Sequence, residues 1–266
     1  CEDVDVFEFD CLESTLWAGV RRLGPGQRIV LQRPADLAAP RIETWWTPPA
    51  CDEGAVAPDA AEWLTETLRD AVRIRAATEV PSTALVSGGL DSAIVQAIAR
   101  YPRVYCATFP ADGIDCMPLA RLAAQGAQVV PVTFDLDEAR GALPHIAYHL
   151  DTPATWSALA LWFLARQMHR DGVRVVLSGE GADEVFGGYD LFKEAKIRRF
   201  WARQPHLKIR PRILERLYPY LKHSPASGRA FTEKFFSQGM EHKDRAFFAH
   251  IPRWTTTRRI AQFFSP

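Results

Sequence analysis

The first 50 residues contain short apolar runs interrupted by glycine and proline, a pattern typical of a small β element. Apolar runs at residues 16–20 and 27–31 flank the turn at residues 23–26, whose sequence Leu-Gly-Pro-Gly suits a β-hairpin. A further short strand is predicted at residues 42–46. It ends before Pro48 and Pro49, which cannot extend a ladder. We therefore expect residues 1–50 to form a β segment.

Strand and helix patterns alternate from residue 51 to residue 190. After a polar linker, Leu64, Leu68 and Val72 recur at helical spacing and predict a first helix. Runs rich in β-branched residues predict four strands, at 83–86, 104–109, 129–134 and 173–177. Helices are predicted at 93–99, 119–124, 137–149 and 156–169. Such alternation predicts an α/β fold, a doubly wound parallel sheet with helices on both faces.

Residues 191–266 have a helical and basic pattern with interleaved aromatic residues, and they are predicted to be a helical extension. Basic residues with aromatics could bind RNA. Glutamates interrupt the positive charge, however, so a solvated helical face is the favoured interpretation.

Composition limits the class of protein. The 266 residues are 47% hydrophobic and 24% charged, with 32 basic and 32 acidic residues, so no net charge favours nucleic acid or a membrane as partner. The chain has no apolar run of the ~20 residues that a bilayer span needs, and no signal peptide opens it. Five cysteines without a CxxC motif favour a reduced, cytoplasmic protein.

The loop Ser87–Ser92, with the sequence SGGLDS, joins a predicted strand to a predicted helix. Its small residues let backbone N–H groups approach a polyanion, and the positive end of the next helix points to the same place. The alternative, a tight glycine turn capped by Asp91 or Ser92, does not explain two hydroxyls beside a carboxylate. The loop therefore predicts binding of nucleotide phosphates.

A second loop, Ser178–Glu184, follows the fourth predicted strand and brings three carboxylates to the same sheet edge. Carboxylates are the ligands that Mg²⁺ uses beside substrate phosphates. The alternative is an acidic cluster that stabilises a helix N-terminus by ~0.3–1 kcal/mol per residue. Together the two loops predict a site that consumes ATP with Mg²⁺.

The first loop resembles the pyrophosphate loop of the PP-loop ATP pyrophosphatases, which cleave ATP between the α and β phosphates. The segment from Leu177 to Tyr189, LSGEGADEVFGGY, resembles the signature of the asparagine synthetase family. Residues 19–26 and 44–46 also resemble the segment that joins the glutaminase domain of that family to its synthetase domain. The resemblance implies that residues 51–190 are the ATP-binding synthetase core.

The resemblance also implies roles for individual positions. The positions that would bind the nucleotide are Leu85, Ser87, Gly88, Gly89, Asp91, Ser92, Thr108, Ser178 and Gly179. Among them, the serines and glycines of the first loop would hold the pyrophosphate, and Leu85 and Thr108 would border the adenine. Asp91 and Asp183 would bind Mg²⁺, which neutralises the developing pyrophosphate charge.

The implied reaction is the attack of a carboxylate, aspartate above others, on the α-phosphorus of ATP. Ammonia from a glutaminase domain then displaces AMP from the acyl adenylate and forms an amide. The attacking nitrogen must lose a proton, and the resemblance gives this role to Glu180. A carboxylate whose pKa is raised by burial would suit it, because general base catalysis typically contributes ~10²–10⁴-fold.

The chain departs from the family pattern in three places. Asp115-Cys116 stands where many relatives have Asp-Glu, which leaves the role of that segment open. Cys1 lacks the glycine-rich context of a glutaminase nucleophile, and no segment resembling the family's catalytic lysine is found before Pro266. We therefore expect the sequence to be a fragment of a longer protein.

Other interpretations stay open. The same family could act on another carboxylate, as an amidotransferase or a cyclase. The chain could also be an ATP-binding interaction module without full activity, and a tRNA-modifying enzyme is the least favoured reading. The sequence does not determine the oligomeric state, so a homodimer is left open.

Two weaker signals favour structural roles. His145 and His149 share a helix face but lack the glutamate of HExxH and a third ligand. Cys106 and Cys116 could form a redox pair, although buried thiols are the default expectation.

Overall fold

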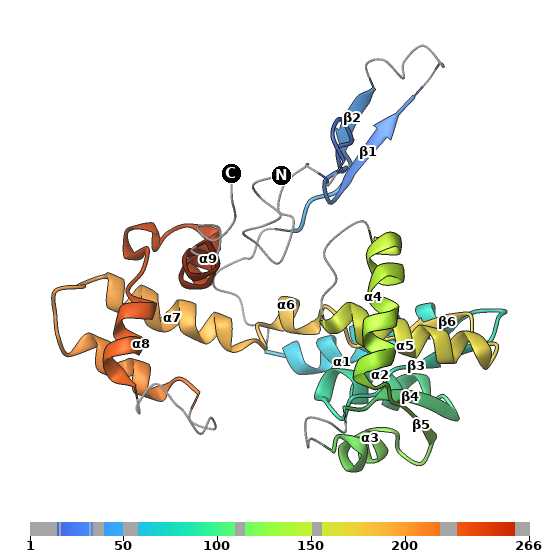
Figure 1. Cartoon of the computed structure of the whole chain (residues 1–266). Coiled ribbons are helices and arrows are strands. Elements are labelled where there is room, and N and C mark those ends of the chain that lie inside the picture. Colours follow the sequence, from blue (N-terminus) through green and yellow to red (C-terminus); the bar gives the residue numbers. More distant parts are fainter. Residues whose placement is uncertain are drawn as a thin grey trace. The chain divides into compact units, whose positions relative to one another are not determined.

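The computed structural model describes residues 15, 17–31, 33, 40–49, 58–109, 115–150, 156–218 and 228–258. The chain divides into two compact units (Figure 1). We call Pro25–Glu180 the sheet unit, and Cys1–Gly24 with Gly181–Pro266 the helical unit. In the described part of the chain, every helix is too short or too polar to cross a membrane.

A hairpin opens the sheet unit. Strand β1 (Gln27–Val30) pairs antiparallel with β2 (Arg41–Thr44). The strands predicted at residues 27–31 and 42–46 are therefore confirmed, each within two residues at either end. The predicted partner at residues 16–20 is wrong, because its described residues, 17–20, form a turn. The turn at Gly26, with φ of +69°, brings the Gly26 carbonyl within 2.9 Å of the backbone nitrogen of Trp45. The chain after β2 therefore returns to the start of β1.

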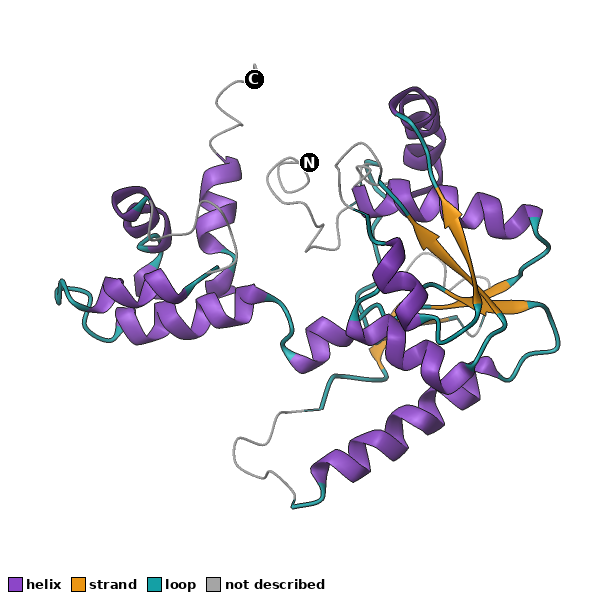
Figure 2. Ribbon diagram, turned by 90° about the horizontal axis from the view of Figure 1, so that it is seen from below, coloured by secondary structure: helices purple, strands orange, loops and turns teal. Residues whose placement is uncertain are grey.

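Four parallel strands form the centre of the sheet unit (Figure 2). Their bounds are β3 Ser82–Ala84, β4 Arg103–Ala107, β5 Gln128–Val132 and β6 Val175–Leu177. β3 pairs with β6, and β4 pairs with β5. A bridge between Leu85 and Tyr105 joins the two pairs, so the strands lie in the order β6, β3, β4, β5. The four predicted strands are confirmed, each within three residues at either end.

Helices cover both faces of β4. Their bounds are α1 Ala60–Ala76, α2 Leu90–Ala99, α3 Met117–Ala123, α4 Leu136–Leu150 and α5 Trp156–Arg170. Tyr105 packs in an apolar cluster with residues of α4 and α5, whereas its neighbours Val104 and Cys106 pack with residues of α1, α2 and α3. Because successive side chains of a strand point to opposite faces, the two clusters lie on opposite sides of β4.

A polar network ties β4 to the end of α5. The hydroxyl of the fully buried Tyr105 donates to Oδ2 of Asp171 at 2.6 Å. Arg103 donates to the same oxygen at 2.6 Å, and Gln167 donates to Oδ1 at 3.1 Å. Burial, followed by the bond to Asp171, raises the pKa of Tyr105 to about 12. The same bond is the largest cause that lowers the pKa of Asp171.

The helical unit confirms the helical pattern predicted after residue 190. Its elements are α6 Ala182–Phe186, α7 Asp190–Ala202, η3 Arg210–Arg216, α8 Arg229–Phe236, η4 Met240–His242, η5 Ala246–Ala249 and α9 Ile251–Arg258. An apolar cluster holds α7, η3 and α8 together, and its buried members are Ile197, Trp201, Leu214, Leu217 and Phe236.

Two fully buried charged residues of α7 lie beside this cluster. Arg198 donates to the backbone carbonyls of Phe236 at 3.0 Å, of Gln238 at 2.6 Å and of Phe248. Burial lowers the pKa of Arg198 to about 10. Glu194 accepts two hydrogen bonds of 2.7 Å from Arg253 of α9. The polar interior of this unit therefore connects α7 to three later segments of the chain.

Candidate functional site

The loop Ser87–Ser92 leaves the sheet at the carboxyl end of β3. Leu85 donates its backbone N–H to Leu177 on one side at 2.9 Å, and Val86 donates to Tyr105 on the other at 2.9 Å. The loop therefore starts from a strand that neighbouring strands hold on both sides. Helix α2 begins at Leu90, three residues after the loop opens.

The two hydroxyls of this loop are bonded to its own backbone. Ser92, which is buried, donates to the carbonyl of Gly89 at 3.1 Å and accepts the N–H of Ser87 at 3.2 Å. Ser87 accepts the N–H of Gly89 at 3.2 Å. Within the described residues, no side chain caps the N-terminus of α2. The N–H groups of its first turn are therefore suited to an anion.

Gly88 is required by two independent constraints. Its φ of +84° is a conformation that residues with a side chain rarely adopt. A Cβ placed on it would lie 2.5 Å from Cβ of Leu119. Helix α3 therefore packs directly against the loop, and this contact leaves room for hydrogen alone.

The second loop meets the first one within the sheet unit. β6 pairs with β3 so that Leu177 lies opposite Ala84, and both loops leave the sheet at the same edge. A Cβ added to Gly179 would lie 2.8 Å from Cβ of Asp91 and 2.8 Å from the backbone nitrogen of Ser92. The backbone of Gly179 thus rests on the first turn of α2, as the sequence predicted for two motifs at one edge.

Ser178 and Glu180 flank this contact. The Ser178 hydroxyl accepts the N–H of Glu180 at 3.3 Å, which tightens the loop. The side chain of Glu180 is exposed. The burial expected for this carboxylate is therefore not found, because the described residues around Glu180 do not enclose its side chain.

Leu85 and Thr108, the two positions expected to border the adenine, both lie at the carboxyl edge. Leu85 bridges to Tyr105, and the buried Thr108 donates its backbone N–H to Val132 at 3.0 Å. The structure thus brings these two residues to the edge from which the Ser87 loop emerges. Their role toward a base stays a prediction.

Asp183 belongs to the helical unit, so a cation shared with Asp91 stays a prediction. It lies on α6 after Gly181, whose φ is +90°. The N–H of Gly188 donates to the Asp183 carbonyl at 3.0 Å, and the Tyr189 hydroxyl donates to Glu184 at 3.1 Å. The second half of the signature thus folds back on itself, which accounts for the glycine pair before Tyr189.

The acidic residues fit a magnesium ion that keeps water and phosphate ligands. Among the described residues, no three or more His, Cys, Asp or Glu side chains gather as metal ligands. Mg²⁺ usually takes one or two carboxylates and completes its shell with substrate phosphates and water. Asp91, in the first turn of α2, supplies carboxylate oxygens of the kind that Mg²⁺ prefers beside the uncapped N-terminus of the helix.

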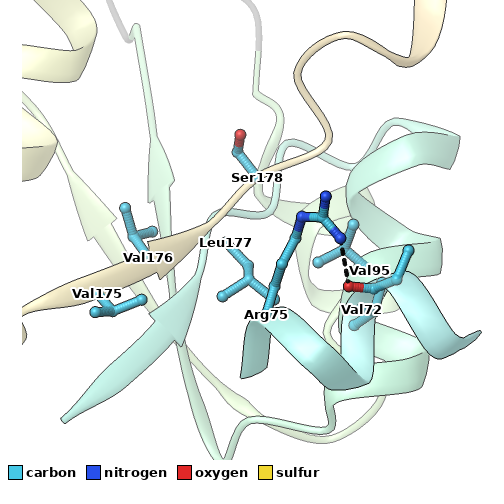
Figure 3. Close-up of a pocket in the computed structure, with 8 residues that line it drawn as sticks. Val72, Arg75, Val95, Val175, Val176, Leu177 and Ser178 are labelled. Atoms are coloured by element: carbon cyan, nitrogen blue, oxygen red, sulfur yellow. Dashed lines mark hydrogen bonds between the residues drawn. The ribbon is translucent and has the colours of Figure 1, made fainter. Parts of the chain in front are cut away.

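A hollow of about 390 Å³ adjoins Ser178 on the outer side of β6. Its lining is mainly apolar, from Val72 of α1, Val95 of α2 and the strand itself. Figure 3 shows Arg75 reaching along this hollow, where it donates to the carbonyl of Ala71 at 2.9 Å. Ser178 and Arg75 are the polar groups among its lining residues.

The sequence did not predict that α3 lies beside the candidate site. Leu119 forms the wall against Gly88, and Asp115 accepts the N–H of Met117 at 2.9 Å where α3 begins. The signal was Asp115-Cys116, whose role had been left open. An aspartate that accepts the backbone N–H two residues later forms a local turn.

Comparison with known proteins agrees with this geometry. Residues 64–264 match the family model described as asparagine synthase. The "Putative asparagine synthetase (glutamine-hydrolyzing)" of Mycobacterium tuberculosis is 37% identical over 194 residues, which cover 68% of this chain and 29% of that protein. Asparagine synthetase (glutamine-hydrolyzing) 1 of Bacillus subtilis is 29% identical, over 71% of this chain and 30% of its own length. Asparagine synthetase B of Escherichia coli is 29% identical, over 50% of this chain and 28% of its own length. The match thus spans less than a third of each of these relatives.

Proposed function

Since the chain belongs to the asparagine synthase family, we propose that it is the ATP-using part of an amide-forming synthetase. It adenylates a carboxylate, with release of pyrophosphate, and ammonia then displaces AMP. Aspartate is the proposed acid, because the relatives are named asparagine synthetases. Their names also point to a glutaminase as the source of ammonia. The proposed fold is the doubly wound PP-loop sheet.

One observation carries the proposal: the two motif loops touch. Gly179 packs on Asp91 and Ser92 with no space for a methyl group, although the loops are more than eighty residues apart in the chain. This contact supports one site at the carboxyl edge of β3 and β6, which is where ligands bind in open α/β sheets.

The residues of the first loop have distinct proposed tasks. Gly88 and Gly89 let the backbone approach the pyrophosphate, and the uncapped first turn of α2 offers it N–H donors. Ser87 and Ser92 hold the loop in shape through their bonds to its backbone. This pre-formed arrangement favours pyrophosphate over solvent as the partner of those N–H groups.

Asp91 and Asp183 are the proposed ligands of Mg²⁺, which would neutralise charge on the leaving pyrophosphate. Glu180 is the proposed proton acceptor for the attacking amine. The side chain is exposed, so it can reach solvent or substrate without rearranging the sheet.

Titration of the protein with Mg-ATP tests the phosphate and metal roles. We expect Asp91→Asn to weaken Mg-ATP binding at least about tenfold, because the variant loses an ionic ligand. Asp137→Asn is the matched control, since Asp137 is an exposed residue of α4 that pairs with Arg140. Equal affinities of wild type and Asp91→Asn would contradict the metal role.

Product analysis tests the reaction. The protein is incubated with ATP, Mg²⁺, ammonium chloride and aspartate, and the nucleotides and amino acids are separated. AMP and asparagine in equal amounts support the proposal, whereas ADP as the nucleotide product contradicts adenylation. AMP formed with a different acid but not with aspartate would contradict the proposed substrate and leave adenylation standing.

A further inference from the structure

Two cysteine thiols, one on β4 and one at the start of α3, lie next to each other. Cys106 lies on β4 and is 1% exposed, and Cys116 is the half-buried residue that precedes α3. Their Sγ atoms are 3.8 Å apart, and both thiols are free. Both also lie near the carbonyl of Ala107, Cys106 at 3.4 Å and Cys116 at 3.3 Å. A disulfide has an S–S length of ~2.05 Å, so bond formation requires an approach of about 1.8 Å.

The position of the pair connects it to the candidate site. Cys116 begins the segment whose next turn carries Leu119, and Leu119 fills the space against Gly88. Ala107, whose carbonyl faces both thiols, directly precedes Thr108 at the carboxyl edge. Movement of Cys116 toward β4 would therefore also move Leu119, which packs against the loop Ser87–Ser92, because a short helix transmits a displacement of its first residue.

We propose that Cys106 and Cys116 are a redox modification site, which low-molecular-weight disulfides convert to an intramolecular disulfide that shifts α3 and weakens phosphate binding. The disulfide itself is independent of the proposed function, whereas its effect on ATP rests on that function.

The chemistry proceeds in two exchanges. Cys116 loses its proton to solvent, and its thiolate attacks one sulfur of the reagent, whose S–S bond breaks and releases one thiol. Cys106 then loses its proton and attacks Cys116 Sγ, which forms the Cys106–Cys116 bond and releases the second thiol. The protein loses two hydrogens and the reagent disulfide is reduced to two thiols.

The different environments of the two thiols set this order. Cys116 is half-buried at the edge of the apolar cluster formed with α1, α2 and α3, whereas Cys106 is buried inside that cluster, so Cys116 is the thiol that a reagent reaches first. Burial and the neighbouring thiol raise the pKa of Cys106 to about 12, so it is a poor first nucleophile. Once a mixed disulfide stands 3.8 Å away, Cys106 attacks at close range and needs no access from solvent.

Mass spectrometry after treatment with oxidised glutathione tests the site. The experiment uses a background in which Cys1, Cys11 and Cys51 are replaced by serine, so that only the pair can react. We expect the loss of two hydrogen masses and a peptide that links Cys106 to Cys116. In Cys106→Ser we expect a stable glutathione adduct on Cys116, and in Cys116→Ser no adduct on Cys106. A stable adduct or two free thiols in the parent would overturn the proposal.

Binding of Mg-ATP by the oxidised and reduced forms tests the coupling. We expect the dissociation constant to rise about tenfold on oxidation and to recover with dithiothreitol, while Cys116→Ser does not respond. An unchanged constant in fully oxidised protein would overturn the coupling. If the reduced protein fails to bind ATP, the proposed function fails, and hydrogen exchange of residues 86–92 decides instead. Faster exchange after oxidation supports the shift of α3, and equal exchange contradicts it.

Discussion

The sheet unit and the helical unit are stabilised in different ways. In the sheet unit, two apolar clusters lie on the two faces of β4. Among its described residues, the buried polar ones carry no charge: Thr83, Ser92, Gln96 and Thr108. In the helical unit, the fully buried Arg198 and Glu194 lie beside the apolar cluster and bind later segments of the chain. Apolar packing is non-directional, whereas each bond of Arg198 specifies one carbonyl. The helical unit therefore depends on single side chains to a greater degree than the sheet unit.

The largest effect is expected from Arg198→Met. The substitution leaves three backbone carbonyls without their charged donor in a buried setting and removes the cation that interacts electrostatically with Glu194, which costs about 3–5 kcal/mol. Urea unfolding followed by circular dichroism should show loss of the helical unit before the sheet unit. Arg199→Met is the matched control, because Arg199 is the exposed neighbour of Arg198 and donates to the backbone carbonyl of Lys243 at 3.2 Å. A loss below 1 kcal/mol for Arg198→Met would contradict the comparison drawn above.

A smaller effect on stability, with a large effect on the site, is expected from Gly179→Ala. The new methyl group would overlap the backbone of Asp91 and Ser92, so we expect a loss of about 1–3 kcal/mol. Mg-ATP affinity should fall at least about tenfold, because the two loops must separate. Gly141→Ala of α4 is the control. It has open space around it, and alanine favours a helix by about 0.5–1 kcal/mol. Unchanged ATP affinity in Gly179→Ala would show that the contact is not part of the site.

The smallest effect is expected from Tyr105→Phe, which removes one donor from Asp171. We expect a loss of about 0.5–1.5 kcal/mol at neutral pH, since Arg103 and Gln167 remain. Tyr148→Phe is the control, because Tyr148 is 79% exposed.

The pH dependence of Tyr105→Phe sharpens this test. The pKa of Asp171 is lowered in the folded protein, so its contribution is present above the unfolded pKa of ~3.9 and is lost as pH falls through the folded pKa. Urea midpoints between pH 7 and pH 2 should therefore fall less steeply in Tyr105→Phe. The pKa of Tyr105 is raised to about 12, so its own contribution is lost above pH ~10. Parallel curves for wild type and variant would contradict the network.

Patterns that repeat along the chain predicted the sheet unit well. β-Branched runs located its parallel strands, and the glycine loops that follow two of them were correctly expected at one edge. The predicted hairpin partner at residues 16–20 was wrong, because the pattern does not say whether residues 27–31 pair with the apolar run before them or with the strand after them.

The position of α3 could not be predicted. The contact of Leu119 with Gly88 depends on how α3 lies on the sheet, which periodicity does not fix. For the same reason the sequence left open whether the thiols of Cys106 and Cys116 meet. Likewise the helical pattern predicted α7 but not the burial of Glu194 and Arg198, because charged residues on a helix are ordinarily solvated.

The pairing of β3 with β6 has a consequence for how the protein folds. Ala84 lies opposite Leu177, ninety-three residues later, so this parallel register closes a very long loop. Pairings of high contact order form slowly, and in a nascent chain the amino-terminal partner is made first. We expect one edge of β3 to stay unpaired during synthesis until β6 has been made. The time between synthesis of β3 and of β6 should therefore determine how strongly the nascent chain aggregates or depends on chaperones.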